Sequence, residues 1–148
     1  MALFSRLRGG SSQDTSIARA VLAPAVLTMA ADGRIDDAEV IQLTNMLTFS
    51  PIFLPLGGKA TGELIKTVLK DLQKSGPDKV ITESAQLLSP ALRETAFCFA
   101  MRVAMADGVL EESEKNVLSG TASRLQLSDQ AFESIVHVVT MMQRSAAA

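Results

Sequence analysis

The chain contains the same acidic turn twice, and this repeat constrains its fold more than any other feature. Residues 31–39 read ADGRIDDAE and residues 106–114 read ADGVLEESE, so that Asp32 and Asp107 stand 75 positions apart (107 − 32). Each copy follows a long apolar segment and precedes an amphipathic one, a pattern typical of a helix, a turn and a second helix. The sequence therefore predicts an internal duplication, with two similar halves packed about a pseudo-two-fold axis.

Composition favours an all-α fold. The 148 residues are enough for a single domain with its own core, and they are 47% hydrophobic but only 4% aromatic, without Trp or Tyr. Alanine, leucine, valine and seven methionines supply most of the apolar residues, which favours closely packed helices over strands. We expect a seven-helix bundle in which one buried central helix from each half lies beside the other. The predicted helices span residues 15–31, 37–48, 59–74, 77–88, 90–106, 112–125 and 129–143.

The chain divides into a helical domain and two short tails. We expect a flexible N-terminal tail over residues 1–13, the helical domain over residues 14–143 and a C-terminal tail over residues 144–148. Asp14 or Thr15 is the predicted N-cap of the first helix, and Pro24 is expected to kink that helix. The apolar loop at residues 49–58 is expected to fold back onto the core.

Charge and single residues exclude several function classes. The net charge is −2, which gives no overall field to attract nucleic acid. No secretory signal or transmembrane segment is recognisable, and the single cysteine, Cys98, fits a reducing compartment, so a cytoplasmic protein is predicted. Cys98 is expected to be buried and His137 half-buried. Without a nucleophile motif or a phosphate-binding loop, the sequence does not suggest an enzyme.

The acidic turns resemble only the second half of a calcium-binding EF-hand loop. Asp32 and Glu39 hold its fifth and twelfth positions, as Asp107 and Glu114 do in the second copy, but the first-half positions carry no carboxylate. Each turn alone supplies too few oxygen ligands for a metal ion, whereas two turns brought together could coordinate one ion. The candidate ligands are Asp32, Asp36, Glu39, Asp107, Glu111 and Glu114. All-oxygen ligands suit calcium, manganese or magnesium, while zinc and di-iron sites lack their histidines and cysteines.

Two other hypotheses compete with the metal site. In the first, the carboxylates serve only to cap helices: Asp36 and Glu39 have capping-box spacing, although the helix dipole disfavours Asp32 and Asp107 at C-terminal ends. The chain would then be a metal-free interaction domain whose partner surface is the apolar loop, with Phe49, Phe53 and Leu54. The second is a metal-dependent hydrolase, which would need an open pocket beside the carboxylates.

The spaced pair of turns resembles the bacterial tellurite-resistance TerB family. The matching residues are Ala31 to Gly33, Ile35 and Glu39, then Ala106 to Gly108, Leu110 and Glu114. The resemblance implies a seven-helix fold, a divalent-cation site and a non-catalytic role beside other proteins. It also implies membrane-associated stress-response assemblies, which would place the chain peripherally at the inner membrane face. The sequence leaves open whether the chain forms a homo-oligomer.

Overall fold

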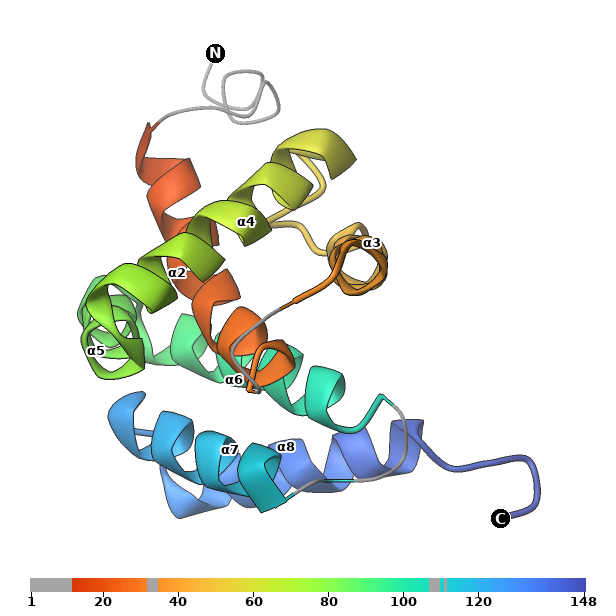
Figure 1. Ribbon diagram of the computed structural model, residues 1–148. Helices are drawn as coiled ribbons and strands as arrows, with labels where there is room; N and C mark the ends of the chain where they lie inside the picture. The colour runs from red at the N-terminus through yellow and green to blue at the C-terminus, as the bar shows by residue number, and fades with distance from the viewer. Residues whose placement is uncertain (1–11, 32–34, 107–109, 111) are drawn as a thin grey trace.

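The computed structural model describes residues 12–31, 35–106, 110 and 112–148. Throughout these residues the regular structure is helical, with seven helices and no strand, which confirms the predicted fold class. No helix of this described part is long and apolar enough to cross a membrane. The helices, labelled as in Figure 1, are α2 (Ser12–Met29), α3 (Asp37–Leu47), α4 (Gly57–Ser75), α5 (Pro77–Leu87), α6 (Pro90–Ala104), α7 (Glu112–Arg124) and α8 (Asp129–Met142).

Helices α2 and α6 form the centre of the molecule, and they pack against each other more extensively than any other pair (Figure 1). Both helices bury alanines completely, among them Ala18 and Ala25 in α2 and Ala96 and Ala100 in α6. Small side chains let two helices approach closely, because the distance between helix axes depends on the side chains at the contact. The predicted central pair is therefore present, whereas the duplication itself and its two-fold axis stay predictions.

The remaining helices cover this pair. Helices α4 and α5 pack on α2, α3 packs on α4, α8 packs on α6, and α7 contacts α2, α5 and α6 (Figure 1). Large side chains fill the spaces between them: Phe97 of α6, fully buried, lies against Phe132 of α8 with ring centroids 5.6 Å apart. One core thus runs through the whole bundle.

Serine, proline and glycine set the helix boundaries where the sequence predicts them. Ser89 and Ser128 cap α6 and α8, their hydroxyl oxygens accepting hydrogen bonds from the Leu92 and Ala131 amides at 3.2 and 3.1 Å. Pro77 stands at the first position of α5, after Gly76 with φ of +87°. The start of α2 differs, because the helix begins at Ser12 and not after Asp14 or Thr15; a first turn held by few bonds is the least predictable part of a helix.

Helix α2 runs unbroken through Pro24. Proline has no amide hydrogen, so the Ala20 carbonyl lacks its usual helical donor at this point. One turn later the buried Thr28 hydroxyl donates to the Pro24 carbonyl at 2.8 Å. Such a hydroxyl bond satisfies the threonine inside an apolar core and is known to bend helices slightly.

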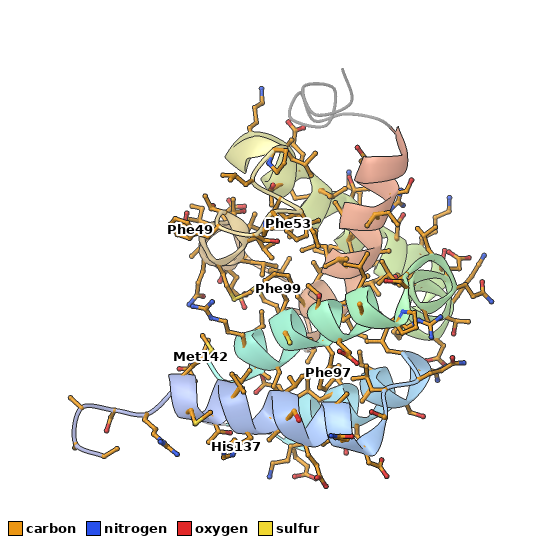
Figure 2. The ribbon with its side chains drawn as sticks, turned by 180° about the vertical axis from the view of Figure 1, so that it is seen from behind. Phe49, Phe53, Phe97, Phe99, His137 and Met142 are labelled. Carbon is orange, nitrogen blue, oxygen red and sulfur yellow. The ribbon has the colours of Figure 1, made fainter. Side chains whose placement is uncertain are left out.

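The apolar loop between α3 and α4 folds back onto the core, as predicted. Amide groups of Phe53 and Leu54 both donate to the Ser50 carbonyl, at 3.0 and 2.8 Å, and close a tight turn. The Phe53 ring is 1% exposed and meets Phe99 of α6 edge to face, with centroids 6.1 Å apart, whereas Phe49 projects into solvent (Figure 2). Phe53 is therefore a core residue and offers no surface to a partner.

Two side chains expected inside lie at the surface. Cys98 is exposed on α6, although both of its neighbours in the AFCFAM run are aromatic. His137 is exposed on the outer face of α8 (Figure 2). In both helices a strongly apolar sequence hides which side faces outward, because the helical period is visible only when polar residues mark the other face.

The burial of Phe53 predicts a sharp contrast with its neighbour. Phe53→Ala is expected to lower the free energy of unfolding by about 3–5 kcal/mol, because it leaves a cavity against Phe99. Phe49→Ala removes an exposed ring and should change that free energy by about 0.5 kcal/mol or less. Urea denaturation of both variants checks this, and equal effects would show that the loop does not pack on the core.

Candidate functional site

The two acidic turns leave the bundle from the same region. Met29, at the end of α2, lines one cavity of about 200 Å³ together with Val103, near the end of α6, and Ala106, just beyond that helix. The other lining residues come from α3, from α6 and from just after α8: Gln42, Leu43, Met46, Arg102 and Gln143. The central packing of α2 on α6 thus brings together the C-terminal ends from which the two turns start.

Three of the six candidate metal ligands fall within the described residues. Asp32, Asp107 and Glu111 lie outside them. Asp36 is exposed, while Glu39 and Glu114 are half-buried. Across the part of the chain that the structure describes, no group of three His, Cys, Asp or Glu side chains could hold a metal ion. The cavity between the helix ends is likewise lined by no carboxylate in that part.

Asp36 and Glu39 form a complete capping box at the start of α3. The Glu39 amide donates to Asp36 Oδ1 at 2.8 Å, and the Asp36 amide donates to Glu39 Oε1 at 3.1 Å. Two backbone donors that no helical carbonyl can reach are satisfied in this way. This confirms the predicted capping box and shows that both carboxylates have a structural role. Each carboxylate retains a second oxygen beyond this pair of bonds.

The second turn leads into α7 in a similar way. Glu112 and Glu114 stand in the first turn of α7, where the positive end of the helix dipole favours negative charge. Glu112 pairs with Lys115 at 3.8 Å, on the surface, and Glu114 also takes part in an interaction. Solvent screens such an exposed pair, which contributes little stability.

Several large apolar side chains are exposed, and three of them lie on α3 and the loop that follows it. Phe49 is 87% exposed and Leu54 is 61% exposed, so these two members of the predicted partner surface are available. Ile41, on α3, is also 61% exposed and was not predicted. Val40 faces the core, whereas Ile41, rotated about 100° further around α3, faces solvent. We call Ile41, Phe49 and Leu54 the apolar rim.

Cys98 has the character of a weakly reactive thiol. Partial burial raises its pKa, and the negative charge of Glu94, one turn earlier on α6, raises the pKa further. A raised pKa lowers the thiolate fraction at neutral pH, and the thiolate is the reactive species. Exposure alone does not therefore make Cys98 a nucleophile.

Comparison with known protein families decides the identity of the fold. The family model described as tellurite resistance protein TerB matches residues 18–137. The chain belongs to the TerB family. The matched range begins in α2 and ends in α8, and so includes both acidic turns. No curated protein and no solved structure matches the chain significantly.

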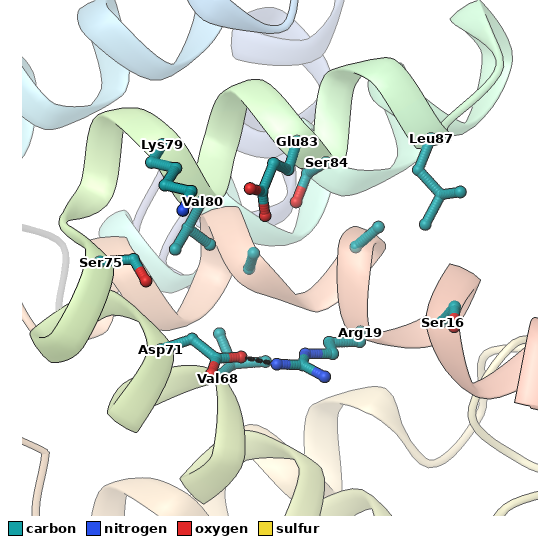
Figure 3. A pocket seen from close by; sticks show the side chains of 12 residues that line it. Ser16, Arg19, Val68, Asp71, Ser75, Lys79, Val80, Glu83, Ser84 and Leu87 are labelled. Carbon is teal, nitrogen blue, oxygen red and sulfur yellow. Dashed lines mark hydrogen bonds and ion pairs between the residues drawn. The ribbon is translucent and has the colours of Figure 1, made fainter.

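One further feature of this TerB protein, a cavity lined by charged residues, could not be predicted from its sequence. A cavity of about 400 Å³ lies between α2, α4 and α5, lined by charged side chains of both signs (Figure 3). Lys79 and Glu83 stand four residues apart on α5, which places them on one helix face. That spacing is common on solvated helices, so it does not by itself indicate a cavity.

The capping box makes a prediction about Asp36. Asp36→Ala should lower the free energy of unfolding by about 1 kcal/mol, because the Glu39 amide loses its acceptor. Asp36→Asn keeps a good capping oxygen and should cost only a few tenths of a kcal/mol, roughly. Urea denaturation without metal compares them. Equal losses in the two variants would mean that the charge, and not the cap, stabilises α3.

The raised pKa of Cys98 predicts slow alkylation. Iodoacetamide should react with Cys98 more slowly at neutral pH than with a free thiol, and the rate should rise as the pH approaches the raised pKa. Glu94→Gln removes the repelling charge and should move the rate profile to lower pH. Mass spectrometry of the alkylated protein gives both profiles. An unchanged profile in Glu94→Gln would leave burial as the sole cause.

Proposed function

We propose that this chain is a non-catalytic TerB module that binds one divalent cation through carboxylates of both acidic turns. The ligands are Asp32, Asp107, Glu39 and Glu114, with Asp36 and Glu111 next in order. Calcium, manganese and magnesium are the candidate ions, since each accepts all-oxygen coordination. Cation binding regulates contact with other proteins in a stress-response assembly of the tellurite-resistance type.

The observation that carries this proposal is the shared cavity at the ends of α2 and α6. Met29 and Ala106 line it together, and each stands within three residues of an acidic Asp-Gly pair. Two turns that leave one region of a bundle can place their carboxylates near one another. Carboxylates in close proximity either raise one another's pKa or bind a cation.

The capping box is compatible with metal binding at Asp36 and Glu39. Each carboxylate uses one oxygen for the backbone of α3, and metal ligands are commonly held by such additional hydrogen bonds. The cap would then fix the direction of the second oxygen. Asp32 and Asp107 are nevertheless the most important ligands in this proposal, because the helix dipole disfavours an aspartate at a helix C-terminal end and capping does not explain their presence.

Exposure of the apolar rim favours a second candidate function, a metal-free interaction domain. Ile41, Phe49 and Leu54 are large apolar side chains exposed to solvent on α3 and the loop that follows it. Exposed apolar groups of this kind are found at contact sites on soluble domains. In this alternative the acidic residues only cap helices, and the partner is another protein. The membrane-associated assembly that the family suggests would bring the chain to the inner face of the membrane as a peripheral cytoplasmic component.

Metal titration of the purified chain tests the main proposal. Calcium or manganese at about 100 times its Kd should stabilise the fold by about 2.7 kcal/mol and raise the Tm by about 8 °C. Asp32→Asn combined with Asp107→Asn should remove this gain, because the amide groups lack the charge that the ion requires. Calorimetric titration with calcium, manganese and magnesium then ranks the ions.

A matched control separates ligation from general charge. Asp37→Asn removes an exposed carboxylate one residue beyond Asp36 and should leave the metal response intact. An unchanged Tm of the wild-type chain at millimolar metal would contradict the cation site. It would leave the interaction domain as the better account.

A further inference from the structure

The cavity between α2, α4 and α5 has an apolar floor and charged walls (Figure 3). Ala20 and Ala23 of α2 form part of the floor, and Val68 of α4 and Val80 of α5 close its sides. The alanines are buried but too small to fill the space between α4 and α5. A volume of about 400 Å³ lies within the range of small-molecule sites, roughly 300–1,000 Å³.

The charged side chains on one wall of the cavity are ion-paired, and those on the other wall are not, within the part of the chain that the structure describes. On one wall the Arg19 guanidinium is ion-paired with the Asp71 carboxylate, so that these two charges neutralise each other (Figure 3). On the other wall Lys79 and Glu83 make no ion pair or hydrogen bond with any residue that the structure describes. Both side chains extend toward the cavity, one positive and one negative.

A third residue continues this row. Leu87 lies one further turn along α5, lines the same cavity and is 49% exposed, a high value for so large an apolar side chain. Lys79, Glu83 and Leu87 are therefore spaced at successive intervals of four residues, about 6 Å along the helix axis. The α5 wall presents a cation, an anion and an apolar group in that order (Figure 3).

We infer that this cavity binds a small zwitterion with an apolar side chain, such as a free apolar amino acid. The ligand's carboxylate pairs with Lys79, its ammonium group pairs with Glu83, and its apolar side chain covers Leu87 and the alanine floor. A simple anion would be repelled by Glu83 and a simple cation by Lys79, and the paired Arg19 and Asp71 add no net charge. A ligand that carries both charges beside an apolar body complements all three side chains of this wall.

Metal ions fit this cavity poorly. Of its two carboxylates, Asp71 is already held by Arg19, and the Lys79 ammonium stands one turn from Glu83. The inference is accordingly independent of the cation site at the acidic turns. Because the charged walls remain open to water, binding is expected in the weak range typical of solvent-screened pairs.

The test is a titration of the full chain followed by amide chemical shifts in NMR spectra. L-leucine should shift the amides of α5 between Lys79 and Leu87 together with those of Ala20 and Ala23. Three analogues should bind more weakly: 3-methylbutylamine lacks the carboxylate, N-acetyl-L-leucine lacks the ammonium group, and glycine lacks the apolar side chain. Equal binding of all four compounds would overturn the inference, as would an absence of shifts at α5.

Substitutions at the charged wall provide the second measurement. Lys79→Gln and Glu83→Gln change exposed helix positions, so the fold is kept, and each should weaken L-leucine binding by about three- to fivefold. Lys70→Gln on α4 and Glu133→Gln on α8 remove matching charges from outside the cavity and should leave the affinity unchanged. If the Lys79 and Glu83 variants bound L-leucine as the wild-type chain does, the charges would have no part in binding and the assignment would fail.

Discussion

The close packing of α2 against α6 is the contact on which the rest of the structure depends. Alanines at the centre of both helices allow a short distance between their axes. Four of the other described helices pack directly on this pair, and α3 packs on α4. The burial of small side chains on two long helices contributes through many weak dispersion contacts rather than through any single strong one. Both acidic turns start at the ends of this pair, so the packing of the core and the position of the candidate cation site have the same origin.

Most helix boundaries could be predicted because each is set locally. A serine that accepts from the amide three residues later, as at Ser89 and Ser128, acts within one turn and needs no distant partner. The same is true of Asp36 and Glu39, whose reciprocal bonds are implied by their spacing. The family resemblance and the helical period then agree on the same seven helices, which is why the fold class could be predicted from the sequence.

Exposure was harder to predict than secondary structure. Phe53 and Phe49 are both aromatic residues of one apolar loop. Phe53 packs on Phe99 whereas Phe49 lies in water, because the turn at Ser50 directs Phe53 toward the core. Cys98 lies between two aromatic residues, and the helices packed against α6, chiefly α2, decide which side of α6 is buried. The cavity between α2, α4 and α5 could not be predicted for a similar reason. The sequence does not show whether Ala20 and Ala23 contact a neighbouring helix or leave a space beside it.

Pro24 gives α2 a mechanical property that the other helices lack. The backbone bond that would resist bending at this point is already missing, so a change in the angle of α2 costs less here than anywhere else along it. Ala20 and Ala23, just before the proline, belong to the floor of the cavity. Bending of α2 at Pro24 would therefore change the shape of that cavity, because part of its floor lies on the segment of α2 just before the proline.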